Sequence, residues 1–130
     1  MDQSDPLSKL VAADAKEIDR KKMADLLEPY VFFDGNTHEI NFKEEFYRLK
    51  TNTDRLEMVF LGNKAKALMF EEKEGLSPLE LIVLEIMPEG SVKSALKVLS
   101  DSKRILKNSE GKYYIPNYRL NEVYSKFQSN

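Results

Sequence analysis

The stretch from Leu76 to Pro116, LSPLELIVLEIMPEGSVKSALKVLSDSKRILKNSEGKYYIP, decides the fold prediction. Ser77, the proline after it and the glutamate three residues on form a capping box, so we expect a helix to begin there. Pro88 lacks an amide hydrogen, so this helix must end before it. We expect Gly90 to permit a sharp reversal and Ser91 to cap a second helix at about residues 91–102.

The second helix has two different faces. Apolar residues recur at i, i+3, i+4 and i+7, which predicts a stripe packed against the core, made of Val92, Ala95, Leu96 and Leu99. The opposite side combines positive charge with short hydroxyl side chains: Lys93, Ser94, Lys97 and Ser100, followed by Lys103 and Arg104. We therefore expect the outward face of this helix to be basic.

A small β-hairpin follows at about residues 104–116. Strand-like residues at 105–107 and 112–115 flank Asn108, Ser109, Glu110 and Gly111, which are turn formers. Gly111 stands where a positive φ is expected, and Pro116 ends the second strand because it has no amide to donate.

Helix, turn, helix and hairpin in this order resemble the winged helix-turn-helix family of DNA-binding proteins. The resemblance covers roughly residues 53–127, counting the helices on either side. It rests on three pieces of sequence: the Ser77, Pro78, Glu80 opening, the Gly90 to Lys93 junction with Ala95 and Leu96 behind it, and the run from Gly111 to Pro116. Ile82 and Ile86 stand where members usually have a small residue and a glycine, so we expect the turn to be built around Gly90.

The resemblance implies double-stranded DNA as the partner. The helix at about 91–102 would be the recognition helix that enters the major groove, and the hairpin at about 104–116 would be the wing. The implied fold class is α+β and mostly helical, with a winged helix-turn-helix domain at 43–130 and an N-terminal helix and β-hairpin extension at 1–42. The candidate DNA-binding residues are Lys93, Ser94, Lys97, Ser100, Lys103, Arg104, Lys107 and Lys112.

Charge is unevenly distributed along the 130 residues, whose formal net charge is −2. Residues 71–90 contain one basic and six acidic residues, whereas residues 91–130 contain eight basic and three acidic residues. Binding to a polyanion requires a basic face and not a basic protein. The acidic stretch before that face predicts modest, strongly salt-dependent affinity for DNA of random sequence.

The N-terminal third predicts the extension. An amphipathic helix is expected at about 6–27, with an interruption near the charged residues 19–22, and a hairpin with strands at 30–33 and 38–42. A short helix after Phe42, a long helix from about residue 53 to 73 and a closing helix from about 117 complete the prediction. Apolar residues of the first helix, or of the closing helix, could pair two copies in a homodimer; those in question are Leu7, Leu10, Val11 and Ile18, and Leu120, Val123, Tyr124 and Phe127.

Composition and motifs limit the other classes of function. The chain has no cysteine and no apolar run of about 20 residues, which predicts a cytoplasmic protein with no membrane contact. No nucleophile elbow, phosphate loop, HExxH or Rossmann motif occurs, so we expect neither an enzyme nor a cofactor. His38 is the only histidine, and we expect it and Glu71, Glu72 and Glu74 to be structural or solvated, with no metal site.

Two functions remain open at this point. The first is a DNA-binding transcription regulator, in which Ser94, Lys97 and Ser100 would face base edges and Lys93, Lys103, Arg104 and Lys112 would face phosphates. The second is a winged-helix protein–protein interaction module in a larger assembly. The acidic net charge and the lack of an arginine on the outward face of the second helix favour the second function.

Overall fold

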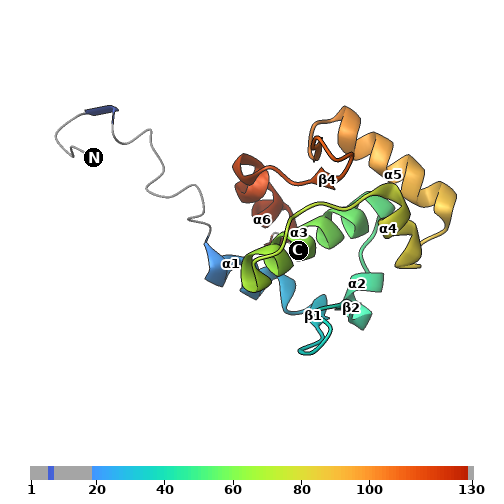
Figure 1. The fold of residues 1–130 in the computed structure, drawn as a ribbon, viewed down its shortest axis with the longest axis horizontal. Coiled ribbons are helices and arrows are strands. Elements are labelled where there is room, and N and C mark those ends of the chain that lie inside the picture. The colour runs from blue at the N-terminus through green and yellow to red at the C-terminus, as the bar shows by residue number, and fades with distance from the viewer. Residues whose placement is uncertain (1–5, 8–18, 129–130) are drawn as a thin grey trace.

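Helices dominate the fold, and two small antiparallel hairpins are inserted among them (Figure 1). The computed structural model describes residues 6–7 and 19–128. In these residues the chain is an α+β, mostly helical fold, as predicted. The elements are α1 (Arg20–Leu27), β1 (Val31–Phe33), β2 (Ile40–Phe42), α2 (Glu44–Tyr47), α3 (Asn52–Phe70), α4 (Pro78–Val83), α5 (Glu89–Asp101), β3 (Leu106–Lys107), β4 (Tyr113–Tyr114), the 3-10 helix η2 (Asn117–Arg119) and α6 (Leu120–Gln128).

Helix α3 is the centre of the molecule (Figure 1). Thr51 caps its start by accepting a hydrogen bond from the amide of Asp54, and Glu71 ends it in the left-handed conformation at φ 54°. Every residue from Leu56 to Gly62 is buried, so no face of these two turns meets solvent. A helix that is apolar on more than one face must be packed on more than one side, and α1, α2, α5 and β4 all contact α3.

Two charged residues lie within the buried part of α3. Glu57 and Lys64 are each only 2% exposed. The ammonium group of Lys64 lies 2.9 Å from Glu74 Oε1 and 2.7 Å from Asn117 Oδ1. Burial raises the pKa of Glu74, and the hydrogen bond from Lys64 opposes that rise. Because an unpaired buried charge is costly, these partners are needed for α3 to occupy the centre.

The capping box at the start of α4 is confirmed. The Ser77 hydroxyl accepts from the amide of Glu80 at 3.1 Å, and the Ser77 amide donates to Glu80 Oε1 at 3.0 Å. Burial opposes ionisation of Glu80, but the Ser77 amide and Lys112 outweigh it and lower the pKa of this carboxyl.

The predicted turn between α4 and α5 is wrong. Helix α5 begins at Glu89, with Pro88 as a cap that uses no side chain, so Gly90 and Ser91 lie inside its first turn. Gly90 does not have a positive φ, and the reversal is made instead by Glu85 at φ 55°. The left-handed conformation of a glutamate costs on the order of 1 kcal/mol of folding free energy. Here the flanking residues Leu84 and Ile86 pack on the core, and their burial offsets that cost.

The second hairpin is short and joins a third segment. β3 pairs with β4 in the register Leu106 with Tyr114 and Lys107 with Tyr113, and Leu76 adds a bridge to Tyr113 through two backbone hydrogen bonds of 2.9 Å. Gly111 has φ 76°, which confirms the predicted conformation of the turn. The residues before α4 are therefore tied to the far strand of the hairpin.

The N-terminal extension shares the same core. Helix α1 begins at Arg20, where Asp19 is extended and its carboxylate caps the helix by accepting from the amide of Lys22. The predicted helix before Asp19 lies mostly outside the described residues. Leu10, Val11 and Ile18 lie outside the described residues. The β1–β2 hairpin is confirmed, and Ile40 approaches so close to Gly62 of α3 that a Cβ there would lie 2.7 Å from its Cδ1.

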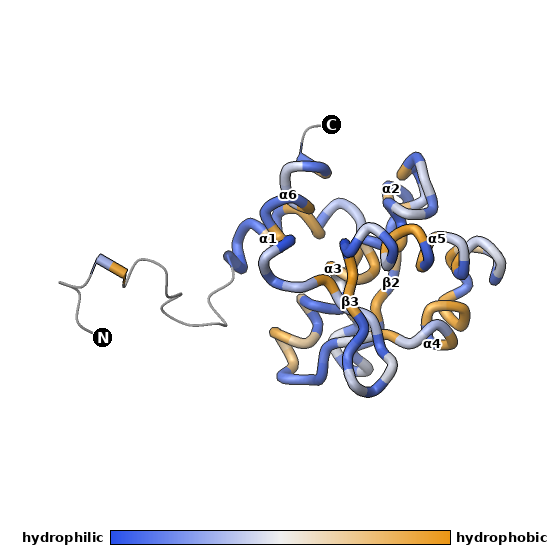
Figure 2. The backbone as a smooth tube through the Cα atoms, turned by 90° about the horizontal axis from the view of Figure 1, so that it is seen from above, coloured by the Kyte–Doolittle hydropathy of each residue, from blue (hydrophilic) through white to orange (hydrophobic). Residues whose placement is uncertain are grey.

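Helix α6 closes the core with its apolar stripe. All four residues of the stripe are buried: Leu120, Val123, Tyr124 and Phe127. The described structure shows this stripe covering the core. A homodimer through α6 would have to use the opposite side of that helix. Figure 2 shows how hydrophobic and hydrophilic residues are distributed along these elements.

Two glycine substitutions test this description of the backbone. Gly75 has φ 134°, and a Cβ there would lie 3.0 Å from Lys112 Cβ and 3.2 Å from Asn108 Nδ2. Gly75→Ala should therefore lower the free energy of unfolding by about 1–3 kcal/mol. Gly90→Ala should raise it by up to about 1 kcal/mol, since Gly90 is helical and has open space around it. Urea unfolding measures both; a loss of stability in Gly90→Ala would contradict the observed start of α5.

Candidate nucleic-acid interface

The outward face of α5 carries Lys93 and Lys97, two of the predicted DNA-binding residues. Its inner stripe is buried as predicted, with Val92 and Leu99 fully inaccessible, and it packs on α3 and α4. Lys93, Ser94 and Lys97 are exposed on the other side, and Ser100 is half-buried at the edge of that face. The helix therefore presents two lysines one turn apart with a serine between them.

Each lysine on this face has a carboxylate one turn away. Lys93 Nζ lies 3.6 Å from Glu89, and Lys97 Nζ lies 3.3 Å from Asp101. These are exposed pairs at i, i+4, which contribute only about 0.3–0.5 kcal/mol each. A phosphate could therefore replace the carboxylate at little cost, although the two acidic residues reduce the net charge of the face.

The end of α5 places another lysine beside this face. Lys103 is exposed and left-handed at φ 60°, at the position after the helix cap where glycine is usual. The amide of Arg104 then donates to the carbonyl of Leu99 at 2.9 Å. The chain thus turns sharply from α5 into β3, and Lys103 lies at the corner.

Arg104 has a structural partner as well as an exposed side chain. One of its terminal nitrogens lies 3.3 Å from Oε1 of the buried Glu57. The same carboxylate receives Lys126 of α6 at 2.5 Å, and Lys126 also lies 2.6 Å from Asp54. Hydrogen bonds to these carboxylates raise the pKa of Lys126 against the effect of its burial, which lowers it. Arg104 and Lys126 together neutralise the charge of Glu57.

The second hairpin contributes two lysines of different surroundings. Lys107 is exposed and lies over the ring of Tyr113, 5.7 Å from its centroid. Lys112 is half-buried and lies 3.2 Å from Glu80 of α4. At the tip, Glu110 lies 3.3 Å from Lys73, so a carboxylate and not a basic residue is at the end of the hairpin.

A hydroxyl-rich hollow between the starts of α3 and α5 was missed from the sequence. Its lining includes Thr51, Thr53, Ser91 and Ser94. Both helices begin there, so amide donors that the helices leave unbonded lie close by. The sequence predicted a helix start at about residue 53, but nothing in it indicated which other helix start would lie beside it.

The other residues considered for chemistry have structural surroundings. The ring of His38 stacks on Phe70 with centroids 3.7 Å apart, and its Nδ1 lies 3.6 Å from Glu72. Glu72 and Glu74 reach different lysines, Lys66 and Lys64. Within residues 6–7 and 19–128, no group of three or more histidine, cysteine, aspartate or glutamate residues is arranged to hold a metal ion. None of the helices in that part of the chain is long and apolar enough to cross a membrane.

Comparison of the chain with protein-family models, curated proteins and solved structures found no match.

Substitution of neighbouring basic residues separates the structural role of Arg104 from that of an exposed lysine. Arg104→Gln should lower the free energy of unfolding by about 1–3 kcal/mol, because the buried Glu57 loses one of its two counter-charges. Lys103→Gln should change it by less than about 0.5 kcal/mol, since its side chain is exposed. Chemical denaturation measures the free energy of unfolding of both variants. If Arg104→Gln lost no more stability than Lys103→Gln, the ion pair between Arg104 and Glu57 would contribute nothing to stability.

Proposed function

We propose that the chain is a DNA-binding transcription regulator and that residues 43–130 form its winged helix-turn-helix domain. The order of elements supports this proposal: α3, the bridging segment at Leu76, α4, α5, and the β3–β4 hairpin follow one another as the family resemblance implies. In this assignment α5 is the recognition helix and the β3–β4 hairpin is the wing.

The observation that carries the proposal is the face of α5. Lys93, Ser94 and Lys97 project from a helix whose apolar side is fully buried, and the chain leaves this helix directly into a hairpin. Between residues 89 and 112 the sequence contains six basic and three acidic residues. Lysines on a helix face and on the hairpin that follows it are suited to the negative charge of DNA phosphates.

Each residue then has an assigned role. Ser94 and Lys97 face base edges, with Ser100 at the margin, and Lys93, Lys103, Lys107 and Lys112 approach phosphates. Arg104 contacts phosphate only through the part of its side chain that Glu57 leaves accessible. The hydroxyl groups of Thr51 and Thr53 offer further phosphate contacts beside the start of α5. A regulator of this kind acts by occupying a promoter region.

The second candidate is a winged-helix module that binds another protein. Glu89, Asp101 and Glu110 on the same surface favour it, because carboxylates repel phosphate. The exposed part of α5 also has no arginine, which is the commonest reader of guanine, whereas Val98 is 54% exposed on that helix. Binding to duplex DNA distinguishes the two candidates.

The test of the proposal is binding to double-stranded genomic fragments, measured by fluorescence anisotropy over a range of salt concentrations. If four to five phosphates are neutralised per protomer, the slope of log affinity against log salt should be about −4. Lys93→Glu with Lys97→Glu should abolish binding while the protein remains folded in thermal unfolding, because both side chains are exposed.

The matched control changes the same number of charges elsewhere. Lys21 and Lys50 are exposed and belong to neither α5 nor the second hairpin. Lys21→Glu with Lys50→Glu should retain most of the affinity. Equal losses in the two double variants would mean that only net charge matters, and unchanged binding in the α5 variant would reject the proposed face.

A further inference from the structure

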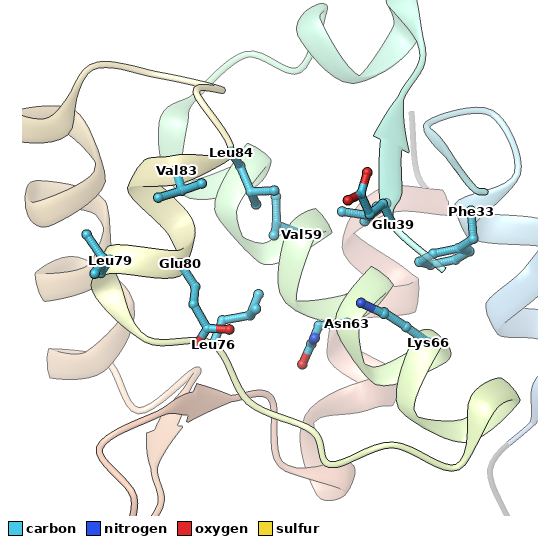
Figure 3. A pocket seen from close by; sticks show the side chains of 11 residues that line it. Phe33, Glu39, Val59, Asn63, Lys66, Leu76, Leu79, Glu80, Val83 and Leu84 are labelled. Carbon is cyan, nitrogen blue, oxygen red and sulfur yellow. The ribbon is translucent and has the colours of Figure 1, made fainter. Parts of the chain in front are cut away.

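A groove lies between α4, α3 and the first hairpin (Figure 3). It has a volume of about 570 Å³. Figure 3 shows Glu80 and Leu84 of α4 on one side, with Leu79 and Val83 farther out on the same helix, and Phe33 and Glu39 of the first hairpin on the other side. Side chains of α3 lie between them. The groove is thus formed by three elements that are far apart in the sequence.

The apolar residues of this groove are unusually exposed. Leu79 and Val83 lie one turn apart on α4 and are each 69% exposed, whereas Leu81 between them is fully buried. Figure 2 shows α4 and the residues after it as a mostly hydrophobic segment of the chain. Two large apolar side chains on the same face of a short helix, next to an apolar groove, are typical of a surface that binds a partner.

Acidic residues surround the groove. Glu39 contributes to its lining, as does Glu80, which is also paired with Lys112 at 3.2 Å, and Glu85 is exposed at the turn that follows Leu84. Lys66 is the one basic residue in the lining, and its ammonium lies 3.9 Å from Glu72. The chain around α4, residues 71–90, carries six glutamates and one lysine. A partner must therefore supply apolar side chains for the groove and positive charge for its rim.

We propose that this groove binds a basic amphipathic helix of a partner protein, with apolar residues of that helix against Leu79 and Val83 and its lysines or arginines facing Glu39, Glu80 and Glu85. Opposite charges at the rim direct the partner and exclude acidic ones. The groove would give the protein a protein-binding surface that is separate from the lysines of α5. It does not depend on DNA binding.

Two other occupants fit the charge less well. The first 18 residues of this chain contain four acidic and two basic residues, so they would bring more negative charge to an acidic rim. A second copy docking α4 against α4 would bring the same glutamates together. Charge complementarity therefore favours a basic partner over either.

The test uses the full chain labelled with ¹⁵N and a helical probe peptide of about 14 residues, with leucines at i, i+3 and i+7 and lysines between them. Amide shifts should change in the first hairpin, α4 and the middle of α3. A peptide with glutamate in place of every lysine should bind at least about tenfold more weakly. Shifts centred on another surface, or equal binding of the two peptides, would overturn the proposal.

Variants of the protein locate the binding surface. Leu79→Ser with Val83→Ser should weaken binding of the lysine peptide at least about tenfold and leave the fold intact, because both side chains are exposed. Val98→Ser, which removes an exposed valine from α5, is the matched control and should bind normally. Unchanged affinity in the α4 variant would overturn the proposal.

The rival occupants are distinguished in the same protein. If the N-terminal segment occupies the groove, Leu10→Asp with Val11→Asp in the full chain should shift the amides of α4 and increase peptide binding. If a second copy occupies it, sedimentation should show a dimer that dissociates in the Leu79→Ser, Val83→Ser variant. Either result would overturn the proposal. The proposal is supported if the protein sediments as a monomer and the α4 amide shifts are unchanged in the Leu10→Asp, Val11→Asp variant.

Discussion

The burial of two opposite charges inside α3 is the constraint on which the rest of the structure depends. The middle of α3 is enclosed on all sides and buries apolar surface, but Glu57 and Lys64 place a carboxylate and an ammonium in the interior. Each needs a counter-charge with good geometry, because an isolated buried charge costs several kcal/mol. The partners come from other parts of the chain: Arg104 and Lys126 for Glu57, and Glu74 with Asn117 for Lys64.

These partners fix the surfaces on which the proposals rest. Arg104 begins the chain that leads into the second hairpin, so its contact with Glu57 ties the end of α5 and the start of β3 to the central helix. Glu74 directly precedes Gly75 and the segment that bridges to Tyr113, so its contact with Lys64 fixes the approach to α4. The basic face of α5 and the acidic groove beside α4 are therefore held by the same central helix.

Much of the fold followed from local sequence patterns, and the exceptions have a common cause. The capping box at Ser77, the apolar stripe of α5 and the positive φ of Gly111 depend on near neighbours, and all three are as predicted. The reversal between α4 and α5 is at Glu85 and not at Gly90. Among the described residues, four residues other than glycine are left-handed, namely His38, Glu71, Glu85 and Lys103. Propensity alone cannot identify such positions.

In the candidate sites, too, local features could be predicted from the sequence and long-range contacts could not. The outward lysines of α5 could be predicted from periodicity, because a helix face is a local property. Contacts between distant residues could not be predicted in this way. Arg104 was predicted to contact phosphate, but it is paired with Glu57, 47 residues earlier in the sequence. No local sequence pattern indicates that contact. The groove beside α4 was missed for the same reason, since its walls come from the first hairpin, α3 and α4.

The most direct test of this account is a double-mutant cycle on Lys64 and Glu74, measured as free energies of unfolding in urea. Glu74→Leu leaves the Lys64 ammonium without its counter-charge in the interior, so it should cost about 3–5 kcal/mol. Adding Lys64→Met to that variant should recover at least about 2 kcal/mol, because the unpaired charge is removed. Additive losses in the double variant would contradict the claim that paired charges hold the surrounding elements to α3.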